Sequence, residues 1–299
     1  MIYNIKTQWI CSIIASLVIT CIIIPDAVAE EINWTGCGIV KHAFMAEIAK
    51  AYEAKTGIKI NISGGGATKG IRSASAGIRD LGGTCRHWLI NSSGAKHLEE
   101  KNADLIQIAW DAIVVIAHPD NPVENTSLAD LKKIYDGKIT NWKNVGGPDK
   151  RIVLVTRTGK YSGVGHMFRR LIFNDPEYTF KARSLKVKSS GPLEKKIEKT
   201  VTALGVTGIS SAKKRKIKYL SIDGISPDKE NIASGKYPLW RPLYIAINKN
   251  PPDKSRKVID FILSQEGQDI ISAQGTVNLT EGAALKSLWN KKKEKMGLK

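Results

Sequence analysis

Cysteine is scarce in this chain. There are 4 cysteines in 299 residues, and two of them, Cys11 and Cys21, lie in an apolar segment at the N-terminus. Only Cys37 and Cys85 remain beyond it, so a disulfide-rich scaffold is excluded and at most one intramolecular disulfide can form. Their separation does not match a recognised zinc-binding pair such as Cys-x-x-Cys.

Long apolar runs are also missing after the N-terminus. No later run reaches the roughly 18 apolar residues typical of a spanning helix. At the N-terminus itself, Lys6 precedes an apolar run at 9–24, and Pro25 and the small-residue triplet at 27–29 follow. This order predicts a signal peptide at residues 1–29 that is cleaved on export to the periplasm. An uncleaved membrane anchor is the alternative interpretation.

Signatures of catalysis and of nucleotide binding are absent. The sequence has no nucleophile elbow, no His-Glu-x-x-His segment, no Walker A loop and no spaced-glycine dinucleotide motif. Cys85 and His87 lie close together in the sequence, but that pair alone is weak support for a thiol catalyst. We therefore predict that the chain is not an enzyme and needs no cofactor.

Acidic residues are clearly outnumbered. The chain has 46 Lys and Arg against 28 Asp and Glu, a formal net charge of +18, and such a balance attracts anions. The basic clusters at 213–218 and 291–295 are not interleaved with stacking aromatic residues, and no zinc-finger or RNA-binding signature is present. We interpret these clusters as solvated surface and do not expect nucleic acid as a partner.

Short β-rich runs alternate with helical patterns along the rest of the chain. Strands are predicted at 59–62, 113–117 and 152–155, and helices at 44–55 and 255–272. This alternation indicates an α/β protein with parallel strands. There are no internal repeats and no long low-complexity linker, so any domain boundary must lie within compact structure.

Four turns rich in glycine or serine lie between a predicted strand and a predicted helix, at 35–38, 63–71, 162–165 and 189–192. Glycine lets the backbone approach a ligand closely, and the first turn of a helix has free N–H groups. One such turn carries little information on its own. Several facing one another would surround a small anion with amide donors.

Several segments together resemble the phosphate-binding proteins of ABC importers, within the type II periplasmic binding proteins. The segments are 64–71, 80–82, 131–148, 237–244 and 264–268. The resemblance runs nearly end to end after the signal. It implies an α/β fold of two lobes, each a mixed, mainly parallel sheet flanked by helices, with two crossovers. The first lobe would hold residues 30–110 and 239–299, and the second lobe residues 111–238.

The resemblance also implies a set of site residues. Family sites use hydroxyls and amides at four turns together with an arginine; Ser162 and Gly163 match a Ser-Gly pair, and Arg157 matches the arginine. The residues expected to line the anion site are Gly38, Ile39, Val40, Lys41, Ala67, Thr68, Cys85, Arg86, Arg157, Ser162, Gly163 and Val164.

The sequence departs from the family pattern at some of these positions. Val40, Ala67 and Val164 stand where the family usually has hydroxyls, and Cys85 replaces a serine or aspartate. Each lost hydroxyl removes a hydrogen bond of about 0.5–1.5 kcal/mol. Backbone donors survive such substitutions, so a phosphate-sized anion is still expected.

Both remaining cysteines fall in ligand-facing turns in this comparison. Three interpretations stay open for Cys37 and Cys85: a disulfide between neighbouring loops, two free thiols, or a soft-metal site completed by His87 or His166. For each histidine, a surface or packing role is favoured.

The predicted function is that of an exported, monomeric solute-binding protein. It would capture phosphate or a phosphate-like oxyanion between two lobes and deliver it to an ABC permease in the inner membrane. The alternative is a non-transport sensor, redox or metal-binding protein that uses Cys37 and Cys85 on the same fold.

Overall fold

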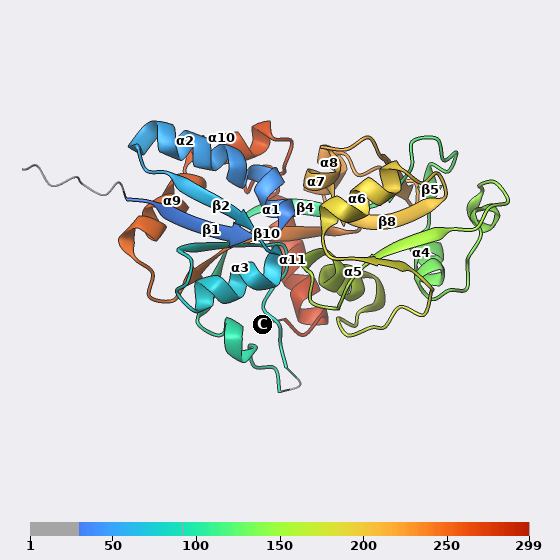
Figure 1. Cartoon of the computed structure of the whole chain (residues 1–299), viewed down its shortest axis with the longest axis horizontal. Coiled ribbons are helices and arrows are strands. Elements are labelled where there is room, and N and C mark those ends of the chain that lie inside the picture. The colour runs from blue at the N-terminus through green and yellow to red at the C-terminus, as the bar shows by residue number, and fades with distance from the viewer. Residues whose placement is uncertain (1–29, 92, 299) are drawn as a thin grey trace, which may run out of the picture.

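The computed structural model describes residues 30–91 and 93–298. The predicted signal segment therefore lies outside the described residues. Within those residues, no helix has both the length and the apolar character needed to cross a membrane. The chain forms two α/β lobes that lie side by side (Figure 1).

The first lobe contains a sheet in which β1 pairs in parallel with β2 and β3, and β10 runs antiparallel to β3 and β4. Its strands are β1 (Ile32–Gly36), β2 (Ile60–Gly64), β3 (Leu81–Thr84), β10 (Trp240–Asn248) and the first part of β4 (Ala103–Ala117). Its helices are α1 (Gly38–Val40), a π-helical turn (Lys41–Met45), α2 (Ala46–Thr56), α3 (Gly66–Ser75), a 3-10 turn (Leu98–Glu100), α9 (Asp253–Leu263) and α10 (Gln265–Ala273).

The second lobe is built on the other end of β4, which pairs with β8 and β9, while β6 lies parallel to both β8 and β7. Its strands are β5 (Asn125–Thr126), β6 (Val153–Arg157), β7 (Leu185–Val187), β8 (Ala203–Gly208) and β9 (Lys218–Ile222). Its helices are α4 (Leu128–Tyr135), a 3-10 turn (Trp142–Val145), α5 (Gly163–Phe173), α6 (Ser190–Glu198), α7 (Ile209–Ala212) and α8 (Lys229–Ala233).

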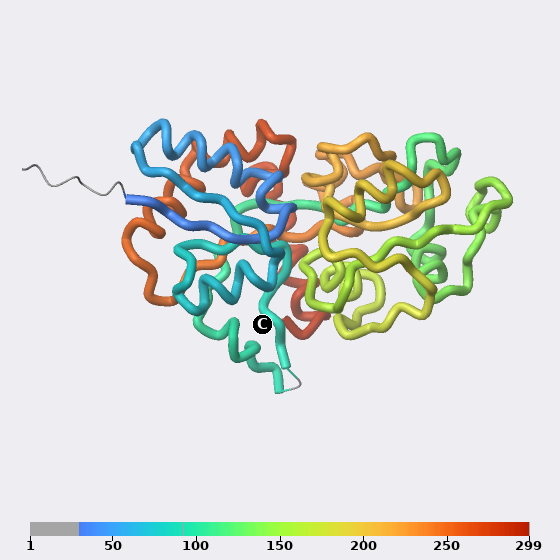
Figure 2. Tube along the Cα trace, viewed as in Figure 1, coloured from blue at the N-terminus to red at the C-terminus, as the bar shows by residue number. Residues whose placement is uncertain are grey.

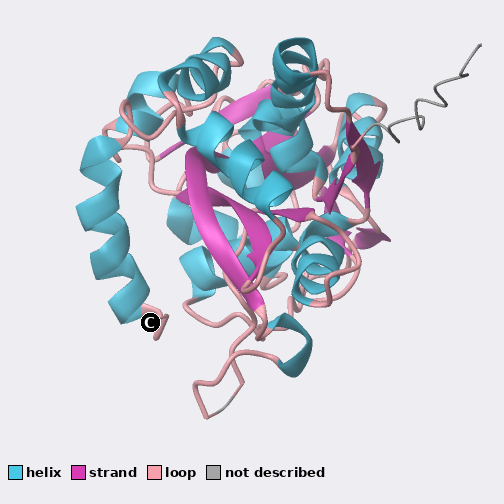
Figure 3. Cartoon of the chain, turned by 90° about the vertical axis from the view of Figure 1, so that its left-hand side faces the viewer, coloured by secondary structure: helices cyan, strands magenta, loops and turns pink. Residues whose placement is uncertain are grey.

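Two strands carry the chain between the lobes. β4 pairs with β10 as far as Ala112 and with β8 from Ile113 onward. β10 begins at Trp240, directly opposite Ala112. The path β2-β1-β3-β10-β4-β8-β6-β7 is therefore continuous through both lobes. Helices cover both faces of the strands in the side view (Figure 3), which explains why residues 108–117 of β4 are buried without alternation.

Most predicted elements are confirmed, with shifts at their ends. The helix at 44–55 is part of a longer helical segment that starts at Gly38 and ends at Thr56, where Gly57 caps it with a φ of 73°. The predicted strand at 113–117 is the second part of the 15-residue β4. A single helix at 255–272 is wrong, because Ser264 is extended and accepts a hydrogen bond from Gly267 N–H, so that α10 starts anew.

A buried ion pair joins the two long strands where they pass between the lobes. Arg241 Nη2 lies 3.1 Å from Asp111 Oδ2, and both side chains are fully buried. Asp111 Oδ1 also accepts from Ser210 N–H and Oγ–H. Arg241 Nη1 donates to the carbonyls of Cys85 and Gly163, each at 3.3 Å, so this one guanidinium contacts turns from both lobes.

The C-terminal helix α11 (Ala283–Lys295) contacts both lobes and lies between them in the chain trace (Figure 2). Trp289 stacks on His87 of the first lobe, with ring centroids 5.7 Å apart. Lys292 Nζ donates to Pro238 O, and Arg170 Nη1 donates to Met296 O beyond the helix. The segment 239–299, predicted to belong to the first lobe, therefore also packs on the second.

Two histidines are buried: His87, which stacks on Trp289 of this helix, and His166 of α5. His87 Nε2 is 2.6 Å from Tyr244 Oη, and burial lowers the pKa of His87 to about 3. His166 Nε2 accepts from Arg170 Nε at 3.2 Å, and burial likewise holds the pKa of His166 well below its ordinary value. Both rings are therefore neutral at physiological pH.

Removing the carboxylate of the buried ion pair is expected to destabilise the protein strongly. Asp111→Ala leaves the Arg241 charge buried without a counterion, which lowers the free energy of unfolding by about 3–5 kcal/mol. Urea denaturation measures this loss. The matched control is Asp104→Ala, an exposed carboxylate on the same strand, which changes stability by less than about 0.5 kcal/mol. An equal loss of unfolding free energy in the two variants would contradict a stabilising role for the Asp111–Arg241 pair.

Acid is expected to destabilise the folded protein through these histidines. The pKa of His87 in the folded state lies below the unfolded value of about 6.5, so stability is lost as the pH falls between those values. At pH 5 the loss from His87 is about 2 kcal/mol. Denaturation of His87→Phe at pH 7 and pH 5 should show a smaller pH effect, whereas His97→Phe, at a more exposed position, should keep the wild-type dependence. An unchanged dependence in His87→Phe would refute this.

Candidate anion-binding cleft

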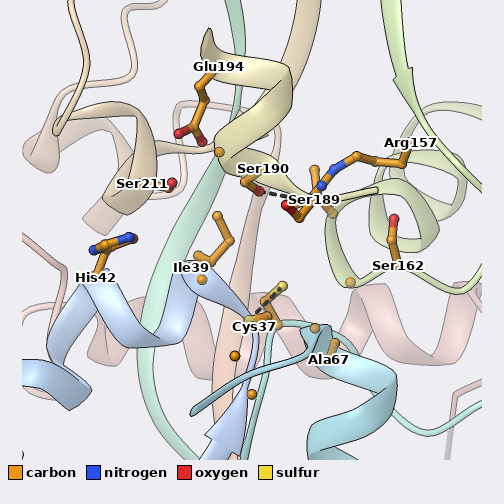
Figure 4. Close-up of a pocket in the computed structure, with 18 of the residues that line it drawn as sticks. Cys37, Ile39, His42, Ala67, Arg157, Ser162, Ser189, Ser190, Glu194 and Ser211 are labelled. Atoms are coloured by element: carbon orange, nitrogen blue, oxygen red, sulfur yellow. Dashed lines mark hydrogen bonds between the residues drawn. The ribbon is translucent and has the colours of Figure 1, made fainter. Parts of the chain in front are cut away.

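A cavity of about 580 Å³ lies where turns from both lobes meet, and Figure 4 shows it in close-up. The first lobe contributes the turns after β1, β2 and β3, and the second lobe contributes the turns after β6 and β7 together with α6 and the end of α7. The lining residues are Gly36, Cys37, Gly38, Ile39, His42, Gly64, Gly65, Gly66, Ala67, Cys85, Arg157, Ser162, Gly163, Val164, Lys188, Ser189, Ser190, Gly191, Glu194, Ser211, Lys214 and Arg215.

Four helices begin at the wall of this cavity. α1, α3, α5 and α6 start at Gly38, Gly66, Gly163 and Ser190, each of which lines the cavity. The first N–H groups of a helix have no partner within the helix and carry the positive end of its dipole. Helix starts converging from both lobes therefore give the cavity a positive potential from the backbone alone.

Glycine makes one of these turns possible. Gly65 and Gly66, directly before and at the start of α3, have φ values of 151° and 84°. Residues with side chains rarely adopt such angles. The Gly-rich segment after β2 thus forms the tight turn that the sequence indicated, and it brings Ala67 to the cavity (Figure 4).

Arg157, at the end of β6, is a half-buried cation of the cavity. Its Nη2 donates to Ser190 Oγ at 2.7 Å, whereas Nε and Nη1 are buried without any hydrogen-bond partner. Burial lowers the pKa of Arg157 to about 10, so the guanidinium is still charged at neutral pH. An oxyanion in the cavity would supply the acceptors that these two donors lack.

The other charges around the cavity are mainly positive. Lys188, Lys214 and Arg215 line it, and Glu194 is the one carboxylate among the described lining residues. Glu194 is already engaged, because its Oε1 accepts from Thr207 Oγ1 at 2.7 Å and its Oε2 lies 3.5 Å from Arg215 Nε. The electrostatic balance of the cavity therefore favours an anion.

The two cysteines lie together on the first-lobe side of the cavity. Their sulfur atoms are 3.5 Å apart, both side chains are buried, and they are free thiols. The hydrogen bond between them lowers the pKa of Cys85, whereas burial raises the pKa of Cys37. The other proposed metal ligands, His87 and His166, do not line this cavity. In residues 30–91 and 93–298, no three His, Cys, Asp or Glu side chains gather as a metal site would require.

The lobes touch at the cavity. A Cβ atom placed on Gly163 of the second lobe would lie 2.5 Å from Cys85 Sγ and 3.0 Å from Ala67 Cβ, so only glycine fits there without displacement. Thr68 Oγ1 and Arg86 Nε of the first lobe both donate to Tyr161 O of the second. The described conformation therefore has the turns of the two lobes in direct contact.

Eight of the twelve residues predicted from the sequence line the cavity. They are Gly38, Ile39, Ala67, Cys85, Arg157, Ser162, Gly163 and Val164.

The other four predicted residues lie outside the lining. Val40 is fully buried in the core, Lys41 is exposed, and Thr68 bonds to the second lobe. Arg86 is the main correction: its Nη2 and Nη1 lie 2.7 and 3.0 Å from the two oxygens of Glu100, both side chains being buried. Its charge is therefore neutralised by protein and is not available to a ligand.

Several lining residues were not among those predicted. Ser189, Ser190 and Gly191 belong to a turn that the sequence indicated, and its serine-glycine pattern was the available signal. His42 lies within a few residues of the predicted turn at 35–38, which was its signal. Glu194 and Ser211 carried no comparable signal, because their positions depend on how α6 and α7 pack against the helical segment after β1. Burial lowers the pKa of His42, and so favours its neutral form.

Known proteins match most of the chain. A profile described as a PBP superfamily domain matches residues 29–266. The phosphate-binding protein PstS of Borreliella burgdorferi is 35% identical over 188 residues, covering 60% of this chain and 67% of that protein. The phosphate-binding protein PstS of Bacillus subtilis is 27% identical over 257 residues, covering 86% of this chain and 83% of that protein.

Solved structures of proteins assigned to phosphate transport also superpose on most of this chain. A protein from Clostridium perfringens, solved with bound phosphate and assigned to phosphate ABC transport, superposes with a TM-score of 0.71 at 28% identity, covering 83% of this chain and 99% of that one. An ABC-type phosphate transport receptor from Vibrio cholerae superposes with a TM-score of 0.64 at 27% identity, covering 83% and 100%. The chain therefore belongs to the PBP superfamily and, within it, to the solute-binding proteins related to PstS.

Proposed function

We propose that this protein captures phosphate, or an oxyanion of similar size and charge, in the cleft between its lobes and delivers it to an ABC permease. The observation that carries the proposal is Arg157, a buried guanidinium with two unpartnered donors at the point where the helix starts converge. Relatives that bind phosphate, including one solved with bound phosphate, support the choice of ligand.

The physical basis is the cost of a buried charge without a counterion. Nε and Nη1 of Arg157 have lost water without gaining an acceptor, and that loss is unfavourable. A dianion placed there receives two charged hydrogen bonds and the amides of the helix starts. Because the turns of the two lobes exclude water around it, each contact is stronger than it would be in solution. Binding and lobe closure are therefore coupled.

The serine hydroxyls of the site are arranged for binding and not for catalysis. Ser162 Oγ accepts from Gly165 N–H at 3.1 Å and caps α5. Ser190 Oγ accepts from Arg157 Nη2. In the described part of the chain, neither hydroxyl is hydrogen-bonded to a histidine or carboxylate that would activate it as a nucleophile. We propose that the protein has no enzymatic activity.

Export and the monomeric state are part of the same proposal. The predicted signal at residues 1–29 would place the protein in the periplasm, where a solute-binding protein meets its permease. Both walls of the cavity come from one chain, so a second copy is not needed to complete the site.

Removing the guanidinium of Arg157 is expected to weaken anion binding strongly. Two charged hydrogen bonds contribute about 1.5–3 kcal/mol each, so Arg157→Ala should raise the Kd for phosphate by about 100-fold or more. Isothermal titration calorimetry of the exported protein with phosphate, arsenate and sulfate measures this.

The matched control is Arg256→Ala, which removes an exposed arginine of the first lobe and should leave the Kd within about twofold. If the wild-type protein binds none of these oxyanions, the proposed ligand class is wrong. If Arg157→Ala binds them as tightly as the wild type, the assigned site is wrong.

A further inference from the structure

A second basic cavity, of about 460 Å³, lies in the second lobe beside the cleft. It is bordered by β6 and β7, the loop that follows β6, and the segment between α5 and β7. Arg157 lines both cavities. The loop at 158–162 leads from this cavity to Ser162 and Gly163 of the cleft.

The lining of the second cavity is strongly cationic. Besides Arg157 it contains Lys160, Arg169, Arg183 and Lys186, and no carboxylate is among its described lining residues. Lys160 is partly neutralised, because its Nζ lies 3.5 Å from Glu177 Oε2. Arg183 and Lys186 are exposed, and neither forms an ion pair with any residue that the structure describes. Such a set of like charges raises the local concentration of anions.

Arg169 gives this cavity a fixed donor. It is 5% exposed, its Nε donates to Tyr178 O at 2.8 Å, and its Nη1 donates to Gly165 O at 3.0 Å. The guanidinium also lies 4.1 Å from the ring centroid of Phe180. These contacts fix the side chain and leave Nη2 without an acceptor among the described residues. Burial lowers the pKa of Arg169, which the nearby charges of Glu177 and Asp175 partly offset.

Hydroxyl groups complete the lining. Thr156 and Lys186 are paired in register on β6 and β7, and Thr156 Oγ1 lies 2.8 Å from Ser184 Oγ. Thr179 adds a third hydroxyl. Arginine forks and hydroxyl groups together are the donors with which proteins bind phosphoryl oxygens.

We propose that this cavity is a second anion site, which binds a ligand carrying one or two phosphoryl groups through Arg169, Arg183 and Lys186. The volume of about 460 Å³ accommodates pyrophosphate as well as phosphate. Because Arg157 is shared, an anion in each cavity would lie on the same guanidinium. The inference does not depend on what the cleft binds, since Arg169 and the exposed cations belong to the second cavity alone.

Nuclear magnetic resonance separates the two sites. The Nε–Hε signal of Arg169 reports on the second cavity, and the backbone amide of Gly163 reports on the cleft. The exported protein is titrated with inorganic phosphate and, separately, with pyrophosphate, against sodium chloride of equal ionic strength. We expect the Arg169 signal to shift with its own saturation curve, and not to shift with chloride.

The variant Arg183→Ala/Lys186→Ala removes two exposed cations and should weaken the Arg169 response by about tenfold or more, while the Gly163 response stays within about twofold. The matched control Lys101→Ala/Lys257→Ala removes the same charge from exposed positions of the first lobe and should change neither response. A tighter response to pyrophosphate than to phosphate would identify a diphosphoryl ligand, and the reverse order would identify a monophosphoryl one.

Three results would overturn the proposal: an Arg169 signal that neither phosphoryl anion shifts, a shift that chloride reproduces, or an equal loss in the control variant. If Arg169 responds and Gly163 does not, the second site stands and the function proposed for the cleft is refuted.

Discussion

An unpaired buried charge organises the cleft of this protein. Two arginines at the junction of the lobes are neutralised by buried carboxylates: Arg86 by Glu100 and Arg241 by Asp111. Arg157 has only the hydroxyl of Ser190. Because buried donors without acceptors are unfavourable, the anion that we propose for the cavity would compensate Nε and Nη1 of Arg157.

The two neutralised arginines, Arg86 and Arg241, hold together the turns that surround Arg157. Arg241 donates to the carbonyls of Cys85 and Gly163, and Arg86 donates to Tyr161 O. Both therefore bind the turns of one lobe to the other, at the wall of the cavity that Arg157 lines. The same ion pairs thus stabilise the fold and hold the lobes together, which leaves Arg157 as the guanidinium with donors free for a ligand. The thiols of Cys37 and Cys85 add a compact, weakly polar wall to the first-lobe side.

The sequence carried much of this arrangement in local patterns. Glycine and serine between strand and helix marked the turns whose backbone lines the cavity, since those residue types are needed for positive φ angles or for helix capping. The resemblance to phosphate-binding proteins supplied the order of the lobes and singled out Arg157. The first kind of information is local in the sequence, and the second is shared across the family.

What the sequence could not supply depends on contacts between distant segments. Arg157 follows a predicted strand and Arg86 lies in a turn that the resemblance marked, and nothing local shows that Glu100 neutralises only Arg86. Likewise, the break at Ser264 follows from the packing of α9 and α10, because a serine within an apolar periodicity is compatible with a continuous helix. Glu194 and Ser211 reach the cavity only through the docking of their helices, and no residue pattern marks that docking.

The most direct test of the unpaired charge is a crystal structure of the exported protein grown with arsenate, whose arsenic atom can be located by anomalous scattering. We expect one arsenate between the lobes, within hydrogen-bonding distance of Nε or Nη1 of Arg157 and of the first amides of the converging helices. Arsenate bound elsewhere while Arg157 keeps both donors free, or an Arg157 paired with a protein carboxylate in the crystal, would contradict the account.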